Sequence, residues 1–137
     1  MDVVALIGRI LFVVLFLGSG FAHLTQTEAM SGYAASKGVP AAKLATQITG
    51  VMMIIGAVMI LLGVWSDLGA LLLVVFLIPT AVLMHAFWKE TDAQAKQMEM
   101  IQFQKDLALG GAALLLFALY AKLGDDLGLT ITGPLFK

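Results

Sequence analysis

The sequence predicts an all-α integral membrane protein, with four transmembrane helices arranged as an up-down bundle. Its 137 residues are 61% apolar and only 12% charged, and the mean hydropathy is +0.99. A soluble domain has about 25% charged and about 45–50% apolar residues, and a small one cannot bury this much apolar surface. The composition therefore excludes a nucleic-acid-binding protein, a disordered linker and an ordinary cytosolic enzyme.

Four apolar segments make up most of the chain. They cover residues 3–24, 44–65, 68–88 and 105–123, and each is close to the ~20 residues that a helix needs to cross a bilayer. Backbone polar groups in a membrane must be paired within the protein, so all four segments are expected to be helices. They form a single membrane domain of residues 1–137 with no room for a soluble catalytic domain. We therefore expect no independent catalytic activity.

The connections between the segments differ in length. Ser66 and Asp67 predict a tight turn between the second and third segments, whereas residues 25–43 and 89–104 form long connections. The last of these alternates charged residues with Ala and Gln, and it predicts a backward, amphipathic extension of the fourth helix. Five lysines lie on the side of the long connections and three basic residues on the other. The positive-inside rule therefore favours the orientation in which the two long connections lie in the cytoplasm.

The first segment has an alternative interpretation. Arg9, the apolar run that follows it, and the small residues Gly20 and Ala22 also resemble a secretory signal peptide.

Polar residues gather where the up-down arrangement brings four helix ends to one membrane face. The candidate ligand-binding residues at this face are His23, Gln47, His85, Trp88, Lys105 and Asp106. Ionisable groups at membrane depth usually face the bundle interior and mark functional sites. The structural alternatives are interfacial anchoring for Trp88 and snorkelling of Lys105 to the head groups.

The two histidines are the most versatile chemical groups of the chain. Both lie near the C-terminal ends of helices that run in the same direction, so His23 and His85 are expected at similar depth. One of them could hydrogen-bond a quinone carbonyl, and a haem held between the two is a less favoured alternative. The sequence has no cysteine, which excludes thiolate-bound metals, and the remaining spacing indicates no metal site.

At the opposite face, Arg9 and Asp67 are expected to form a structural ion pair, because both lie near the same surface of the bilayer.

Several stretches resemble the DoxX family of small bacterial four-helix membrane proteins. They are GRIL at residues 8–11, FLGSGF at 16–21, YAASKGVP at 33–40, HAFW at 85–88 and FQKDLALGG at 103–111. They occur in the family's order and cover almost the whole chain. The sequence departs from the family pattern at His23, where Lys is frequent, at Met53, where Glu is frequent, and at Asp106, where Asn is frequent.

The resemblance implies a bacterial cytoplasmic (inner) membrane protein that acts as an accessory subunit of a quinone-linked respiratory or redox complex. Its partners would be the lipid bilayer and other membrane subunits or further copies of itself. The alternative is a free-standing protein that binds a quinone or lipid near His23 and His85. A small transporter is a weaker third interpretation, because Met53 replaces the family's acidic residue and no inverted repeat is visible.

Overall fold

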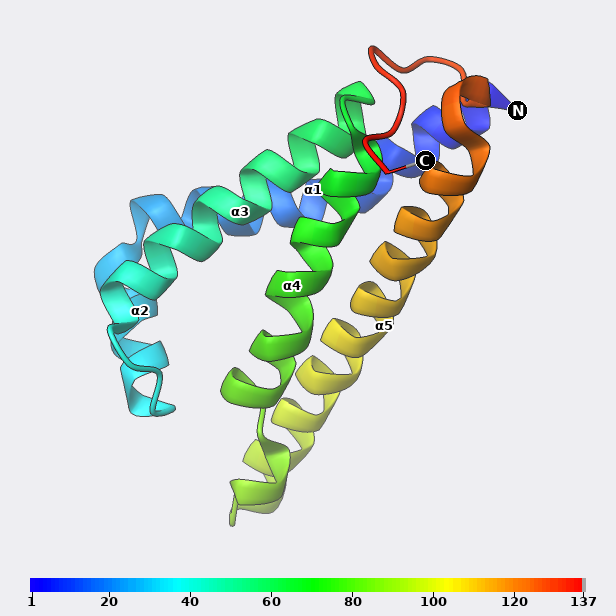
Figure 1. Cartoon of the computed structure of the whole chain (residues 1–137). Helices are drawn as coiled ribbons and strands as arrows, with labels where there is room; N and C mark the ends of the chain where they lie inside the picture. Colours follow the sequence, from blue (N-terminus) through cyan, green and yellow to red (C-terminus); the bar gives the residue numbers. More distant parts are fainter. Residues whose placement is uncertain (137) are drawn as a thin grey trace.

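The computed structural model describes residues 1–136, and these residues are mostly helical (Figure 1). Four of the helical stretches are long and apolar enough to cross a membrane, which confirms the predicted four-span, all-α fold. In chain order the helices are α1 (Asp2–Thr25), α2 (Thr27–Ser36), α3 (Ala42–Leu62), α4 (Ser66–Met84), the one-turn η1 (Phe87–Lys89), α5 (Ala93–Leu123) and the one-turn η2 (Gly124–Asp126).

The connections differ from the expectation in two places. The first long connection contains a helix, α2, which the hydrophobic pattern did not indicate. The turn between the second and third spans also lies earlier than Ser66 and Asp67, which instead open α4. Gly63 ends α3 with a φ of 69°, a left-handed conformation that glycine adopts without steric cost.

The last span is longer than its apolar segment. As the charge pattern indicated, α5 extends backwards as one continuous helix to Ala93. Asp92 caps it, because its side chain accepts a hydrogen bond of 2.8 Å from the Ala95 amide.

The spans are arranged as two pairs that diverge. α1 packs on α3 and α4 packs on α5, while α3 and α4 join the two pairs. Figure 1 shows the pairs close together near the start and the end of the chain and spreading apart toward α2 and η1. We call the first region the closed end and the second the open end. Side chains of all four spans form one buried core, with Val13, Phe16, Met53, Ala57, Ile60, Ala70, Leu73, Leu77 and Ala113 at its centre.

Glycines lie at two close helix crossings. A Cβ atom at Gly20 of α1 would lie 2.9 Å from the Gly50 carbonyl oxygen of α3. Likewise, a Cβ atom at Gly56 of α3 would lie 2.9 Å from the Gly69 carbonyl oxygen of α4. Small residues allow helices to approach in a membrane, where no hydrophobic effect drives them together. The α3–α4 crossing lies toward the closed end, which leaves the pairs free to diverge beyond it.

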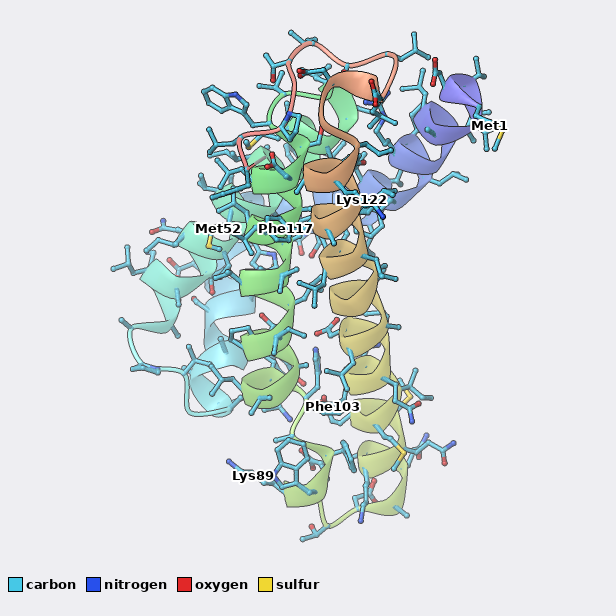
Figure 2. The ribbon with its side chains drawn as sticks, turned by 45° about the vertical axis from the view of Figure 1, so that its right-hand side comes forward. Met1, Met52, Lys89, Phe103, Phe117 and Lys122 are labelled. Carbon is cyan, nitrogen blue, oxygen red and sulfur yellow. The ribbon has the colours of Figure 1, made fainter. Side chains whose placement is uncertain are left out.

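The residues after η2 fold back over the closed end. The amides of Ile131 and Thr132 donate to the Gly63 carbonyl at 3.0 and 2.9 Å, and the Thr132 hydroxyl accepts from the Trp65 amide at 3.0 Å. The ring of Phe136 packs against Phe117 of α5 with centroids 5.8 Å apart (Figure 2). Residues 127–136 thus form a C-terminal strap that covers the turn between α3 and α4.

The strap changes the environment predicted for Arg9 and Asp67. Among the described residues they form no ion pair with each other, and each binds backbone groups of the strap instead. The Arg9 guanidinium donates to the Leu129 carbonyl at 2.7 Å. The Asp67 carboxylate, which is fully buried, accepts from the amides of Leu135 and Phe136 at 2.9 and 2.6 Å.

Candidate functional site

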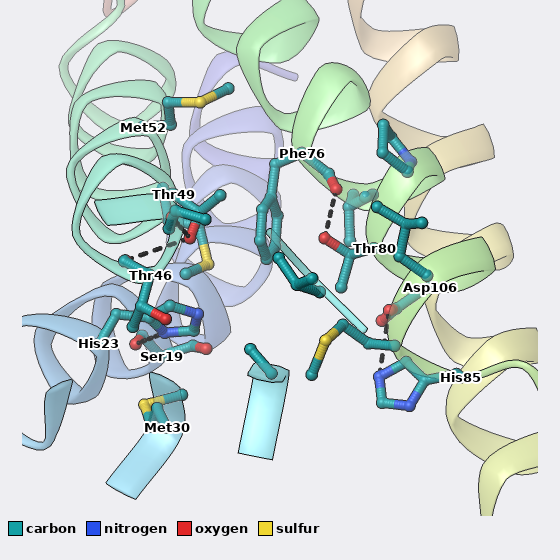
Figure 3. Close-up of a pocket in the computed structure, with 18 of the residues that line it drawn as sticks. Ser19, His23, Met30, Thr46, Thr49, Met52, Phe76, Thr80, His85 and Asp106 are labelled. Atoms are coloured by element: carbon teal, nitrogen blue, oxygen red, sulfur yellow. Dashed lines mark hydrogen bonds and ion pairs between the residues drawn. The ribbon is translucent and has the colours of Figure 1, made fainter. Parts of the chain in front are cut away.

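A cavity of about 680 Å³ lies between the two helix pairs at the open end. Residues of α1 and α3 line one wall, residues of α4 and α5 line the other, and α2 contributes residues toward the membrane surface (Figure 3). Pockets for small molecules are about 300–1,000 Å³ in size, mostly apolar, with a few convergent polar groups. This cavity has both properties. Apolar residues, among them leucines, phenylalanines and methionines, make up most of its lining, and a few polar and charged side chains complete it.

The α1–α3 wall presents hydrogen-bond acceptors to the cavity. The Nδ1 atom of His23 lies 2.7 Å from the Ser19 carbonyl oxygen, and because a carbonyl only accepts, Nδ1 must donate. The Nε2 atom of the neutral ring is then an acceptor. Thr46 and Thr49 donate their hydroxyl protons at 2.8 Å to the carbonyls four residues earlier, so their oxygens still have acceptor capacity. Phe76 of α4 packs edge-on to the His23 ring at a centroid distance of 6.2 Å.

The α4–α5 wall carries charge. His85 follows the last residue of α4, where the helix stops and the chain turns toward η1. Its Nε2 atom lies 3.6 Å from an oxygen of Asp106, and the Lys105 ammonium lies 3.9 Å from the other oxygen. Figure 3 shows His85 and Asp106 together on this side and His23 across the cavity from them.

A charged network bridges the open end beyond the cavity. The Glu99 carboxylate accepts from the Nδ1 atom of His85 at 2.7 Å, from the Tyr33 hydroxyl at 2.7 Å and from Lys37 at 3.3 Å. Lys37 also pairs with Glu90 at 3.0 Å. The hydrogen bond to the Glu90 carboxylate raises the pKa of Lys37 above its usual range, so the ammonium is charged at all physiological pH values. The network therefore ties the end of α2 to α5.

Sequence comparisons agree with this architecture. The sequence profile of the DoxX family matches residues 4–86. "Inner membrane protein YphA" of Escherichia coli (strain K12) is 36% identical over 114 residues, which cover 83% of this chain and 81% of the relative. This chain belongs to the DoxX family. No solved structure matches it. With its four candidate spans, this DoxX protein is a multi-pass protein of the inner membrane.

The DoxX chain brings four of the six candidate residues to one place. His23, His85, Lys105 and Asp106 all line the cavity. Gln47 lies outside it, in the lining of a smaller recess formed by α3 and Leu72 of α4. Trp88 is half-exposed on η1 and packs against the rings of Phe87 and Phe103. Of the six candidate residues, only the four that line the cavity could contact a quinone or a haem bound there.

Both ring nitrogens of His85 face carboxylates, Nδ1 toward Glu99 and Nε2 toward Asp106. A haem iron would have to displace one of them, so the geometry favours hydrogen bonding over iron ligation.

Sequence reasoning missed the network around Glu99. One signal was available, because Glu99 and Asp106 are seven residues apart in one helix and so lie on the same face. The contributions of Tyr33 and Lys37 had no comparable signal, since they depend on where α2 packs.

Proposed function

We propose that this DoxX protein binds an amphipathic ligand, a quinone or quinol in chemical class, in the cavity between its helix pairs. The observation that carries the proposal is the combination of a cavity of about 680 Å³ at membrane depth with polar groups on both walls. A lipid-soluble ligand reaches such a cavity from the bilayer.

Asp106 is the strongest feature for head-group recognition. Its side chain is only 8% exposed, yet the nearest charged groups, on His85 and Lys105, are 3.6 and 3.9 Å away. Both separations exceed hydrogen-bonding distance, and a buried carboxylate that lacks close donors is costly. A ligand hydroxyl would supply the missing donor. A quinol has two hydroxyls, and His23 Nε2 offers a second acceptor on the opposite wall.

The apolar part of the cavity can hold the hydrophobic tail or a ring substituent of the ligand. Met30, Met52 and Met53 line it together with Phe76. Methionine is flexible and polarisable, so it adapts to ligands of different shape. The apolar lining favours a ligand with a hydrophobic chain over a small polar solute.

A binding experiment in nanodiscs tests this function. The probe is an alkyl 4-hydroxyquinoline N-oxide, a fluorescent quinone analogue, with decylubiquinone as competitor. We expect saturable binding that decylubiquinone reverses. Asp106→Leu should weaken it about tenfold, because one hydrogen bond to a charged group is lost.

The matched control is Asp92→Asn, which keeps the helix cap of α5 and lies outside the cavity lining. Absence of saturable binding to the wild type would contradict the proposed function. Equal affinity of the wild type and Asp106→Leu would contradict the assigned head-group position.

An accessory role in a larger membrane complex is a second candidate function. Phe87, Trp88 and Phe103 form an aromatic cluster at the open end, with ring centroids 5.2–5.6 Å apart, and Trp88 is half-exposed. Exposed aromatic residues are enriched at protein interfaces, and this cluster is the observation that favours a partner subunit.

The accessory role predicts a particle larger than one chain. Native mass spectrometry after extraction in mild detergent should detect a defined hetero- or homo-oligomer, and Trp88→Ala should release it. Phe21→Ala, an exposed aromatic residue of α1 away from the cluster, is the control. A strictly monomeric wild-type particle would count against this role.

A further inference from the structure

We propose that Asp106, His85 and Glu99 form a proton relay from the cavity to the membrane surface. The inference rests on the proposed function and narrows its ligand class, since a relay serves a ligand whose polar group exchanges a proton, such as a phenol or a quinol hydroxyl.

The geometry places one imidazole between two carboxylates. His85 Nδ1 lies 2.7 Å from Glu99 Oε2, and its Nε2 lies 3.6 Å from Asp106 Oδ2. Asp106 and Glu99 stand two helical turns apart on one face of α5, while His85 comes from the end of α4. The two nitrogens of one ring thus connect groups that are too far apart to contact each other.

The relay has an inner and an outer end. Asp106 lines the cavity, whereas Glu99 is outside the cavity lining and belongs to the network at the open end. That network continues through Lys37 to Glu90, whose side chain is 29% exposed. The Glu99 side chain is itself 13% exposed, so a proton that reaches it can pass to water at the open end.

The proton transfers balance with water as the final acceptor. A ligand hydroxyl gives its proton to the Asp106 carboxylate. A side-chain rotation that closes the 3.6 Å gap then lets the Asp106 carboxyl pass the proton to His85 Nε2. The resulting imidazolium releases its Nδ1 proton to Glu99, and water takes it from there. The ligand oxygen keeps the electron pair of its O–H bond. His85 is left protonated at Nε2, and exchange of that proton and of the Nδ1 proton with water restores the starting tautomer.

Charged neighbours surround the relay. The His85 ring lies between two carboxylates, and the ammonium groups of Lys37 and Lys105 lie 3.3 Å from Glu99 and 3.9 Å from Asp106. The remaining titratable neighbours are Tyr33 of α2, which donates to Glu99, and Glu90 after η1, which pairs with Lys37.

A pH-jump experiment on the probe-bound protein tests the relay. The alkyl 4-hydroxyquinoline N-oxide is a weak acid whose fluorescence reports its protonation, so the rate at which the bound probe follows external pH can be measured by stopped flow. In the wild type we expect a response within the mixing time. His85→Ala should slow the response about 100-fold, within the range that a positioned acid–base group contributes. Added imidazole should restore the rate.

Glu99→Gln provides a second variant in case His85→Ala does not fold, and it should also slow the response. Glu28→Gln is the control, because Glu28 is an 81% exposed carboxylate paired with Lys43 outside the network. Unchanged rates in both relay variants, or a bound wild-type probe that ignores external pH, would overturn the relay. Failure of the wild type to bind the probe would instead overturn the proposed function.

Discussion

Replacing Gly20 by leucine is expected to disrupt the packing of α1 on α3 and to lower the stability of the whole protein. A Cβ atom at this position would lie 2.7 Å from Ile54 Cγ1 and 2.9 Å from the Gly50 carbonyl oxygen. The backbone oxygen cannot move aside without shifting α3. Overpacking a core costs about 1–3 kcal/mol and occasionally more. The measurement is the thermal unfolding midpoint in detergent, followed by circular dichroism.

Gly18→Leu is the matched control for this prediction. It lies in the same helix, is exposed, and has no atom within 4 Å of its ideal Cβ position. Its unfolding midpoint should stay close to that of the wild type. If both variants behave alike, the crossing at Gly20 does not hold the helices together.

Replacing Asp67 by alanine is expected to release the C-terminal strap. The carboxylate is fully buried and accepts two backbone hydrogen bonds, from Leu135 and Phe136. Hydrogen bonds to charged groups contribute about 1.5–3 kcal/mol each to stability. We therefore expect the free energy that holds the strap in place to fall by about 3 kcal/mol. Limited proteolysis should then cleave residues 127–136 in the variant and spare them in the wild type.

Asp126→Ala controls for the loss of one negative charge at the same membrane face, because Asp126 is exposed. A strap equally resistant to protease in Asp67→Ala would show that its other contacts, to Gly63 and Trp65, hold it without the carboxylate.

The spans could be predicted from the sequence because a single physical requirement sets their length. Each needs ~20 apolar residues, and this signal does not depend on tertiary contacts. α2 and the strap could not be predicted in this way, since both are short and are held by specific partners elsewhere in the chain. The Asp67 carboxylate, for example, binds amides 68 and 69 residues away.

The cavity residues were predictable only in part. Their gathering at one membrane face follows from the up-down order of the helices, which is why His23, His85, Lys105 and Asp106 lie together. The order of the helices does not decide which side of each helix faces the cavity. Gln47 directly follows Thr46 in α3, and one residue rotates a side chain by about 100°, enough to turn Gln47 outward while Thr46 lines the cavity.

The uneven distribution of contacts along the bundle has a mechanical consequence. At the closed end, the strap and the Gly56–Gly69 crossing join the helix pairs through backbone groups. At the open end, side chains of Tyr33 and Lys37 bridge to α5 across the cavity. Long side chains stretch and rotate more easily than packed backbones. The closed end is therefore the stiffer end of the bundle, and a ligand that needs more room is expected to displace the side-chain bridges at the open end first.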